Sequence, residues 1–282
     1  MGGFYGLLGE KLGHSISPEI HSLIFKELNI EGSYNLFEVD KEKLQDVVVG
    51  LKALKSKGVN VTIPYKMDVM EYLDEISQEA KTIGAVNTIC FNEGRTTGYN
   101  TDYFGFGMML DKYDVQIKDK KAVVLGIGGA SMAIFQYLVD KEASEIYLVT
   151  RNKEKGLDTL REQIENCLQD KKVFVISYDE LEGFEKGDVI INCTPCGMYP
   201  KIDSSAVGKN IVEKFSAAVD LIYNPAETLF LRYARECNIK AVNGLYMLVG
   251  QAVAAEELWN NIKIDKSITN NIHKVLVEKN FK

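Results

Sequence analysis

The chain has 282 residues, 46% of them hydrophobic and 26% charged, which suits a globular protein of two ordinary domains. A net charge of −7 and a pI near 5.2 argue against nucleic acid or an anionic membrane as a partner. No apolar run approaches the ~18 residues of a transmembrane helix, and the first residues lack the pattern of a signal peptide, so we expect a cytoplasmic protein.

The first hundred residues alternate short apolar runs with helical patterns. Strands are expected at 5–9, 34–39, 59–63 and 85–91, and helices from residue 17, over 41–56 and from residue 77. Ser17 is predicted to cap its helix, with Pro18 at the first helical position. Residues 92–94, Asn-Glu-Gly, predict a hairpin turn into 96–99. This half is therefore expected to be an α/β domain with some antiparallel pairing.

A helix over 102–112 leads into a second region of the chain. Short β-branched runs at 121–125, 145–149, 172–176 and 188–192 are separated there by helices or turns. Continuous apolar runs are typical of strands buried on both faces, so we predict a doubly wound parallel sheet. Two more strands are expected at 218–223 and 239–242, followed by helices over 245–259 and 266–279.

The run Lys121-Ala-Val-Val-Leu-Gly-Ile-Gly-Gly-Ala-Ser131 combines a buried strand, a glycine turn and a helix start. Such a turn lets the backbone approach a pyrophosphate, and a helix N-terminus offers unpaired N–H groups. The next strand ends in Thr150-Arg-Asn-Lys153, without the acidic residue that binds an NAD ribose. A cation there suits a 2′-phosphate, so NADP is favoured over NAD. The alternative left open is that Arg151, Lys153 and Lys155 are only a solvated helix start.

Five cysteines stand at positions 90, 167, 193, 196 and 237. An odd count in a chain of this type predicts reduced thiols rather than a disulfide framework. Cys193 and Cys196 have redox-motif spacing, which leaves a thiol-redox protein as one alternative function. None of the three histidines stands with a second cysteine pair, so no metal site is predicted.

Several short segments follow one another along nearly the whole chain. They are Gly13-His-Ser-Ile-Ser-Pro18, Gly58-Val-Asn-Val-Thr-Ile-Pro-Tyr-Lys66, Gly84-Ala-Val-Asn-Thr88, Gly98-Tyr-Asn-Thr-Asp102, Leu125-Gly-Ile-Gly-Gly-Ala-Ser131, Asn192-Cys-Thr-Pro-Cys-Gly-Met198, Asp220-Leu-Ile-Tyr-Asn-Pro225 and Asn243-Gly-Leu-Tyr-Met-Leu-Val-Gly-Gln251. Each is a weak signal alone. Together, in this order and at this spacing, they resemble the shikimate dehydrogenase family.

The resemblance implies a substrate-binding domain over 1–103, completed by C-terminal helices over 244–282. A Rossmann-type NADP-binding domain over 104–243 would be inserted between them, with the active site in the cleft. Members of this family reduce 3-dehydroshikimate to shikimate with NADPH, on the route to aromatic amino acids. The oligomeric state, a homodimer included, is left open.

The resemblance also assigns roles to residues. Lys66 and Asp102 would be the catalytic pair, because an ammonium can stabilise the charge that develops on a ketone oxygen and then supply the proton, while the carboxylate orients it. Ser15, Ser17 and Tyr223 would hold the substrate carboxylate. Thr62, Asn87 and Gln251, together with Lys66 and Asp102, would contact the ring hydroxyls. The cofactor would contact Gly126, Ile127, Gly128, Gly129, Ala130, Thr150, Arg151, Asn152, Lys155, Thr194, Leu221 and Gly244.

Some positions depart from the family pattern. Ile127 and Met132 replace a small residue and an arginine in the glycine loop and its helix, which bears on cofactor preference. Tyr103 and Tyr246 replace small residues and are expected to reshape the pocket. Asp102, taken alone, would be interpreted as a helix cap.

Two other functions are weighed against this one. A quinate or quinate/shikimate dehydrogenase using NAD would be expected to have Thr at position 17 and an acid near 150. A non-catalytic nucleotide or metabolite sensor on the same scaffold would have no reason to keep Lys66 together with Asp102.

Overall fold

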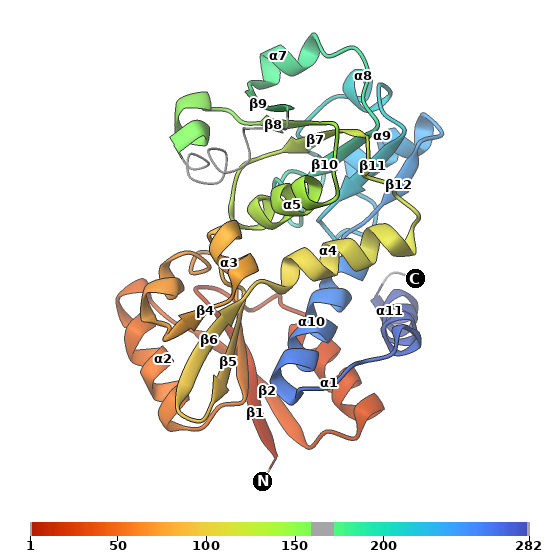
Figure 1. The fold of residues 1–282 in the computed structure, drawn as a ribbon. Coiled ribbons are helices and arrows are strands. Elements are labelled where there is room, and N and C mark those ends of the chain that lie inside the picture. The colour runs from red at the N-terminus through yellow and green to blue at the C-terminus, as the bar shows by residue number, and fades with distance from the viewer. Residues whose placement is uncertain (1, 159–171, 281–282) are drawn as a thin grey trace. The chain divides into compact units, whose positions relative to one another are not determined.

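The computed structural model describes residues 2–158 and 172–280. The chain divides into two compact units, of which unit 1 is Met1–Gly105 with Leu248–Lys282 and unit 2 is Phe106–Met247 (Figure 1). Each unit has one six-stranded sheet. In the described part of the chain, no helix is both long and apolar enough to cross a membrane.

The sheet of unit 1 has the strand order β2-β1-β3-β5-β6-β4. Its strands are β1 (Gly3–Gly9), β2 (Gly32–Glu38), β3 (Gly58–Val61), β4 (Glu75–Ile76), β5 (Thr88–Asn92) and β6 (Arg95–Tyr99). β1 pairs in parallel with β2 and β3, whereas β5 runs antiparallel to β3 and β6. The hairpin between β5 and β6 turns at Glu93 and Gly94, which both have positive φ. The predicted mixture of parallel and antiparallel pairing is confirmed.

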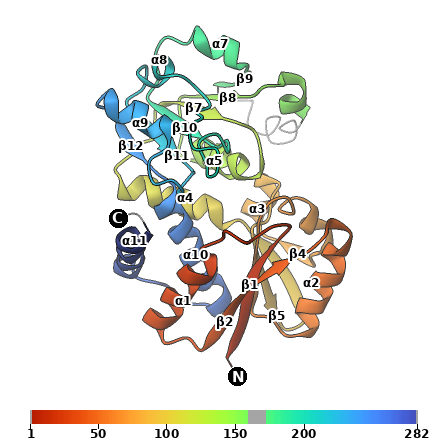
Figure 2. The ribbon, with the colours of Figure 1, turned by 180° about the vertical axis from the view of Figure 1, so that it is seen from behind.

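Helices cover both faces of this sheet. They are α1 (Ser17–Leu28), α2 (Leu44–Ala53), α3 (Gln78–Ile83), the start of α4 (Thr101–Lys112), most of α10 (Leu245–Asn260), and α11 (Lys266–Asn280). Figures 1 and 2 show α2 on one face and α1, α10 and α11 on the other. Val48 and Leu51 of α2 pack on Val59 and Val61 of β3, while Phe25 of α1 packs with Trp259 of α10 and with Tyr5.

Local contacts move several element ends in unit 1. Ser17 does not cap α1: the cap position is Ile16 without a side-chain bond, and Ser17 N donates instead to Ser15 Oγ at 3.2 Å. The expected 41–56 helix begins as a 3₁₀ turn, Lys41–Lys43, before α2. The strand expected to 63 ends at Val61, because Pro64 has no N–H to continue the pairing and Ile63 is exposed.

The sheet of unit 2 is fully parallel, in the order β12-β11-β10-β7-β8-β9. Its strands are β7 (Lys121–Leu125), β8 (Glu145–Val149), β9 (Lys172–Ile176), β10 (Val189–Asn192), β11 (Ala217–Asp220) and β12 (Lys240–Val242). The connecting helices include α5 (Gly129–Asp140), α7 (Tyr178–Glu182), α8 (Lys209–Val212) and α9 (Leu229–Glu236). Residues 122–125 of β7 and all of β10 are almost completely buried, which confirms the predicted doubly wound parallel sheet.

Candidate active site

Lys66 and Asp102 form a nearly buried ion pair in unit 1. Lys66 follows β3, and Asp102 is the second residue of α4. Lys66 Nζ lies 2.6 Å from Asp102 Oδ2, and the two side chains are only 14% and 9% exposed. The fold thus brings together two residues that are 36 positions apart, in a place where water is largely excluded and the Coulomb attraction is strong.

Side-chain amides of neighbouring residues accept hydrogen bonds from N–H groups in the first turn of α4, so the Asp102 carboxylate is available to pair with Lys66. Asn87 Oδ1 accepts from Thr101 N at 2.6 Å, and Asn100 Oδ1 accepts from Tyr103 N at 3.4 Å. The interpretation of Asp102 as the cap is therefore wrong, because Asn100 and Asn87 perform that role. A carboxylate in the first turn of a helix is also favoured by the helix dipole.

A buried polar network lies behind Asn87. Thr88 Oγ1 donates to Asn87 Oδ1 at 3.0 Å and accepts from Asn60 Nδ2 at 3.0 Å, and it lies 3.0 Å from Thr101 Oγ1. Because Asn87 Oδ1 accepts these bonds, the group that Asn87 can offer a ligand is its NH₂. Sequence reasoning missed Asn60, Thr88 and Thr101, although an asparagine inside the otherwise apolar strand β3 was a usable signal.

The residues predicted to bind substrate lie in both units. Ser15 Oγ donates to Ser17 Oγ at 3.1 Å, so the two hydroxyls are side by side at the start of α1. Thr62 follows β3 directly. Gln251 on α10 is 8% exposed, and its Nε2 donates to the carbonyl three residues earlier. Tyr223 belongs to unit 2, where it follows β11 and burial raises the pKa of its hydroxyl.

The glycine loop of unit 2 has the backbone geometry that a phosphate cradle needs. Gly126 has φ +91°, and a Cβ there would lie 2.8 Å from Thr194 Cγ2. A Cβ on Gly128 would meet nothing within 4 Å, so this position is open. Gly128 N donates to Ser131 Oγ at 2.7 Å, which ties the loop to the first turn of α5. The first residues of α5, Gly129 and Ala130, thus follow directly on loop backbone that carries no side chain at Gly128.

A cation stands at the carboxyl end of β8. Arg151 is exposed, whereas Lys153 Nζ is bound by both oxygens of Glu180, at 2.9 and 3.0 Å. Asn152 Oδ1 accepts from Lys155 N at 3.0 Å and so caps the helical residues 153–158. Lys153 is thus paired with a carboxylate, whereas Arg151 is exposed at the start of this turn.

Two further loops of unit 2 approach each other closely. A Cβ on Gly244 would lie 2.0 Å from the carbonyl oxygen of Leu221, so only glycine fits. Gly244 N donates to Ile222 O at 3.0 Å, which fixes this approach. Asn192 Oδ1 accepts from both N and Oγ1 of Thr194, at 3.1 and 2.6 Å. The loops after β10, β11 and β12 are thereby held by backbone and side-chain bonds.

A buried carboxyl underlies these loops. Asp220 accepts from Asn192 Nδ2 at 2.9 Å, Ile222 N at 3.0 Å and Thr228 Oγ1 at 2.6 Å. Burial nevertheless outweighs these bonds and raises the pKa of Asp220 to about 6.

Comparison with known proteins identifies the family. A model described as the shikimate dehydrogenase substrate binding domain matches residues 7–89, and one described as shikimate / quinate 5-dehydrogenase matches residues 109–219. Shikimate dehydrogenase (NADP(+)) of Clostridium perfringens is 51% identical over 272 residues, which cover 96% of this chain and 97% of that relative. The chain belongs to the shikimate dehydrogenase family.

Solved structures agree with this placement. A chorismate mutase/shikimate 5-dehydrogenase fusion protein from Clostridium acetobutylicum is 58% identical, with a TM-score of 0.93 over 99% of this chain and 98% of that one. Shikimate 5-dehydrogenase from Thermus thermophilus, in complex with NADP(H) and shikimate, is 31% identical, with a TM-score of 0.85 over 97% of this chain and 99% of that one.

The residues of unit 2 fit the cofactor that these relatives are named for. The open Gly128 and the α5 N-terminus suit a pyrophosphate, and exposed Arg151 suits a 2′-phosphate. Ile127, a departure from the family pattern, packs toward the next helical segment, because a Cβ on Gly156 would lie 2.9 Å from Ile127 Cδ1. That departure therefore leaves the cradle open.

The other unusual residues have packing contacts. Tyr246 is fully buried with its ring edge-on to Tyr113, and Tyr103 lies edge-on to Phe104. Cys193 is a free thiol whose pKa is raised by desolvation. Cys167 lies outside the described residues.

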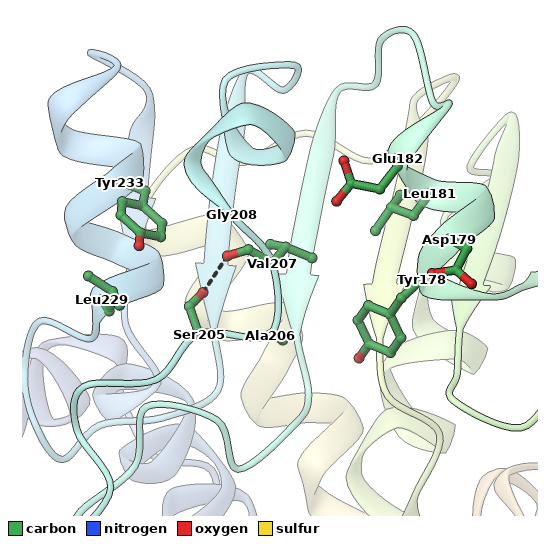
Figure 3. A pocket seen from close by; sticks show the side chains of 10 residues that line it. All are labelled: Tyr178, Asp179, Leu181, Glu182, Ser205, Ala206, Val207, Gly208, Leu229 and Tyr233. Carbon is green, nitrogen blue, oxygen red and sulfur yellow. Dashed lines mark hydrogen bonds between the residues drawn. The ribbon is translucent and has the colours of Figure 1, made fainter.

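A separate hollow of about 340 Å³ lies between α7 and α9 in unit 2 (Figure 3). Its lining is Tyr178, Asp179, Leu181, Glu182, Ser205, Ala206, Val207, Gly208, Leu229 and Tyr233. Two carboxylates and no cation among these residues disfavour a phosphate-bearing ligand. None of the predicted cofactor residues lines it, so this hollow is distinct from the glycine loop.

Proposed function

We propose that the protein is an NADP-dependent shikimate dehydrogenase, which reduces 3-dehydroshikimate to shikimate in the pathway to aromatic amino acids. The observation that carries the proposal is the nearly buried Lys66–Asp102 pair, in a chain 51% identical to a relative of that name. A nucleotide or metabolite sensor would gain nothing from such a pair, since holding it out of water costs free energy.

The proposed chemistry uses the two charges in turn. NADPH, when bound, supplies a hydride to the ketone carbon. The Lys66 ammonium donates one hydrogen bond to Asp102 and can direct another at the ketone oxygen. As negative charge develops there, Lys66 stabilises it and transfers a proton, which completes the hydroxyl and leaves a neutral amine that regains its proton from water. Asp102 holds the ammonium in place and accepts a hydrogen bond from the neighbouring substrate hydroxyl.

The remaining residues of the proposed site recognise a hydroxylated acid. Ser15 and Ser17 would donate their hydroxyls to the carboxylate, joined by Tyr223. Thr62, the NH₂ of Asn87 and Gln251 would bond ring hydroxyls. A site built to bond hydroxyls discriminates strongly against analogues that lack them.

We further propose that unit 1 binds the substrate and unit 2 the cofactor, in line with a substrate domain of 1–103 and 244–282 around a cofactor domain of 104–243. The pyrophosphate would lie on the backbone of residues 126–130, and the 2′-phosphate would meet Arg151 with Thr150, Asn152 and Lys155. Thr194, Leu221 and Gly244 would lie beside the nicotinamide. A cytoplasmic location is also proposed, and the free thiols at positions 90, 193, 196 and 237 support it.

The test is a steady-state assay that follows NADPH absorbance with shikimate or quinate against NADP or NAD. The largest kcat/KM is expected for shikimate with NADP. Quinate should be poorer, because its carboxylate hangs from an sp³ carbon that also carries a hydroxyl, and this fits badly beside paired serines. A larger kcat/KM for quinate with NAD would establish the alternative dehydrogenase, and no turnover with any pair would favour the sensor.

A further inference from the structure

A second pair of ionisable groups lies in unit 1, completely out of solvent. His21 on α1 and Glu256 on α10 are both 0% exposed, and Nδ1 lies 2.5 Å from Glu256 Oε1. The other carboxylate oxygen accepts from Asn260 Nδ2 at 2.8 Å, and Asn260 Oδ1 in turn accepts from the Tyr5 hydroxyl at 2.9 Å. The bond between His21 and Glu256 joins two helices that are more than 230 residues apart in sequence.

His21 sits in an aromatic enclosure and is only half satisfied. Its ring stacks on Tyr34 at 3.9 Å with an interplanar angle of 10°, and Trp259 lies 5.5 Å away. His21 Nε2 is buried and has no hydrogen-bond partner among the described residues. An orphaned polar atom costs free energy, so stability alone is a poor reason for a histidine here.

The pair connects directly to residues of the proposed substrate site. Tyr34, stacked on His21, donates to Asn60 Oδ1 at 2.7 Å, and the Ser17 side chain offsets part of the rise that burial causes in the pKa of the Tyr34 hydroxyl. Ser17 also lies one helical turn before His21 on α1, and Gln251 lies five residues before Glu256 on α10. The bond between His21 and Glu256 therefore links the two helices that carry Ser17 and Gln251.

We propose that His21 and Glu256 are positioning residues, which set the spacing between Ser17 and Gln251 for shikimate. The inference rests on the proposed function of those two residues. Buried polar pairs often add nothing to stability over apolar residues of the same volume, but they demand one geometry, because a shifted helix would leave both groups unpaired. An apolar contact between α1 and α10 would tolerate sliding that this bond does not.

Two substitutions separate geometry from charge. Glu256→Asp keeps the charge but shortens the side chain by one methylene, so α1 and α10 must shift or the bond must break. Glu256→Gln keeps the length and still accepts from His21 Nδ1, while its NH₂ faces Asn260, whose amide must rotate to accept from it. We expect Glu256→Asp to raise the KM for shikimate about tenfold, with kcat and the KM for NADP changed less than about threefold, since a displacement below 1 Å can carry such a cost. Glu256→Gln should restore a KM close to that of the wild type.

An apolar double variant completes the experiment. His21→Phe with Glu256→Leu removes both polar groups and should unfold in urea close to the wild-type midpoint, yet its KM for shikimate should rise at least about tenfold. Lys279→Met is the matched control, because it removes the exposed partner of Glu19 on the same helix α1, and its KM should not change.

Two results would overturn the proposal. One is an unchanged KM for shikimate in folded Glu256→Asp, and the other is an equal loss in kcat and in both KM values, which would indicate general damage to the fold. Failure of the proposed function is distinguishable, because the wild type would then not oxidise shikimate with NADP at all.

Discussion

Replacing Lys66 with methionine removes the ammonium and keeps most of the side chain's volume. A general acid usually contributes about 10²–10⁴ in rate, so turnover should fall by that factor. Shikimate affinity should change much less, because the proposed stabilisation acts when charge develops on the ketone oxygen rather than in the bound ground state. Asp102→Asn should also lower turnover, since the ammonium loses its anchor at 2.6 Å.

The replacement of Lys66 with methionine also has a predictable cost in stability. Breaking a buried ion pair by removing one partner costs about 3–5 kcal/mol, because the other charge is left without compensation. Asp102 is 9% exposed and lies in the first turn of α4, where the helix dipole offsets part of that loss. The free energy of unfolding should therefore fall by an amount near the lower end of that range.

The assay is turnover at saturating shikimate and NADP, with folding checked by circular dichroism and urea titration. Lys52→Met is the matched control: Lys52 also pairs with a carboxylate, Asp74, at 2.8 Å, but the side chains are 35% and 44% exposed. Such surface pairs contribute about 0–1 kcal/mol, so this variant should retain wild-type turnover and nearly full stability. Turnover of folded Lys66→Met within about threefold of the wild type would refute the catalytic assignment.

Three further outcomes are expected. Arg151→Ala should raise the KM for NADP strongly and leave that for NAD nearly unchanged, as kinetics with both cofactors would reveal; equal effects on the two would contradict a 2′-phosphate contact. Cys193→Ala with Cys196→Ala should change turnover only modestly, because desolvation keeps the Cys193 thiol protonated; oxidation sensitivity that disappears in the double variant would contradict this. The carboxyl of Asp220, whose pKa is raised from 3.8 to about 6, stabilises the fold fully below about pH 3.8, and this contribution is lost as pH rises through about 6. In urea titrations, the free energy of unfolding of Asp220→Asn should therefore rise relative to that of the wild type by up to about 3 kcal/mol between about pH 4 and 7. A difference in unfolding free energy that does not depend on pH would count against this reasoning.

The parallel sheet of unit 2 was predictable almost residue by residue. Strands 121–125, 145–149 and 172–176 have the expected bounds, because short runs rich in β-branched and aromatic residues favour strands. Predictions failed where a tertiary bond ended an element. The strand expected over 218–223 stops at Asp220. The carbonyl oxygen of the next residue, Leu221, lies so close to Gly244 that a side chain at position 244 would not fit.

Apart from Asn60 in the apolar strand β3, the polar residues behind the candidate site were not predictable from local pattern. A glutamate or glutamine on a helix has the same sequence signature whether it is solvated or buried. Gln251, which would be taken alone as solvent-facing, is 8% exposed, and Glu256 is 0% exposed. What distinguishes them is the partner, which stands on another helix or strand and is fixed only by folding.

The start of α4 illustrates how a charged residue becomes available for chemistry. Asn100, Thr101 and Asp102 all belong to residue types that cap helices, and their propensities differ too little to decide among them. In the structure each side chain has a different partner. Asn100 accepts from the Tyr103 N–H, Asn87 accepts from the Thr101 N–H, and Asp102 accepts from the Lys66 ammonium. A neutral amide can satisfy an N–H as well as a carboxylate can, but only a carboxylate compensates a nearly buried ammonium. The two asparagines therefore make the ion pair possible, because they remove the competition of the helix end for the Asp102 charge.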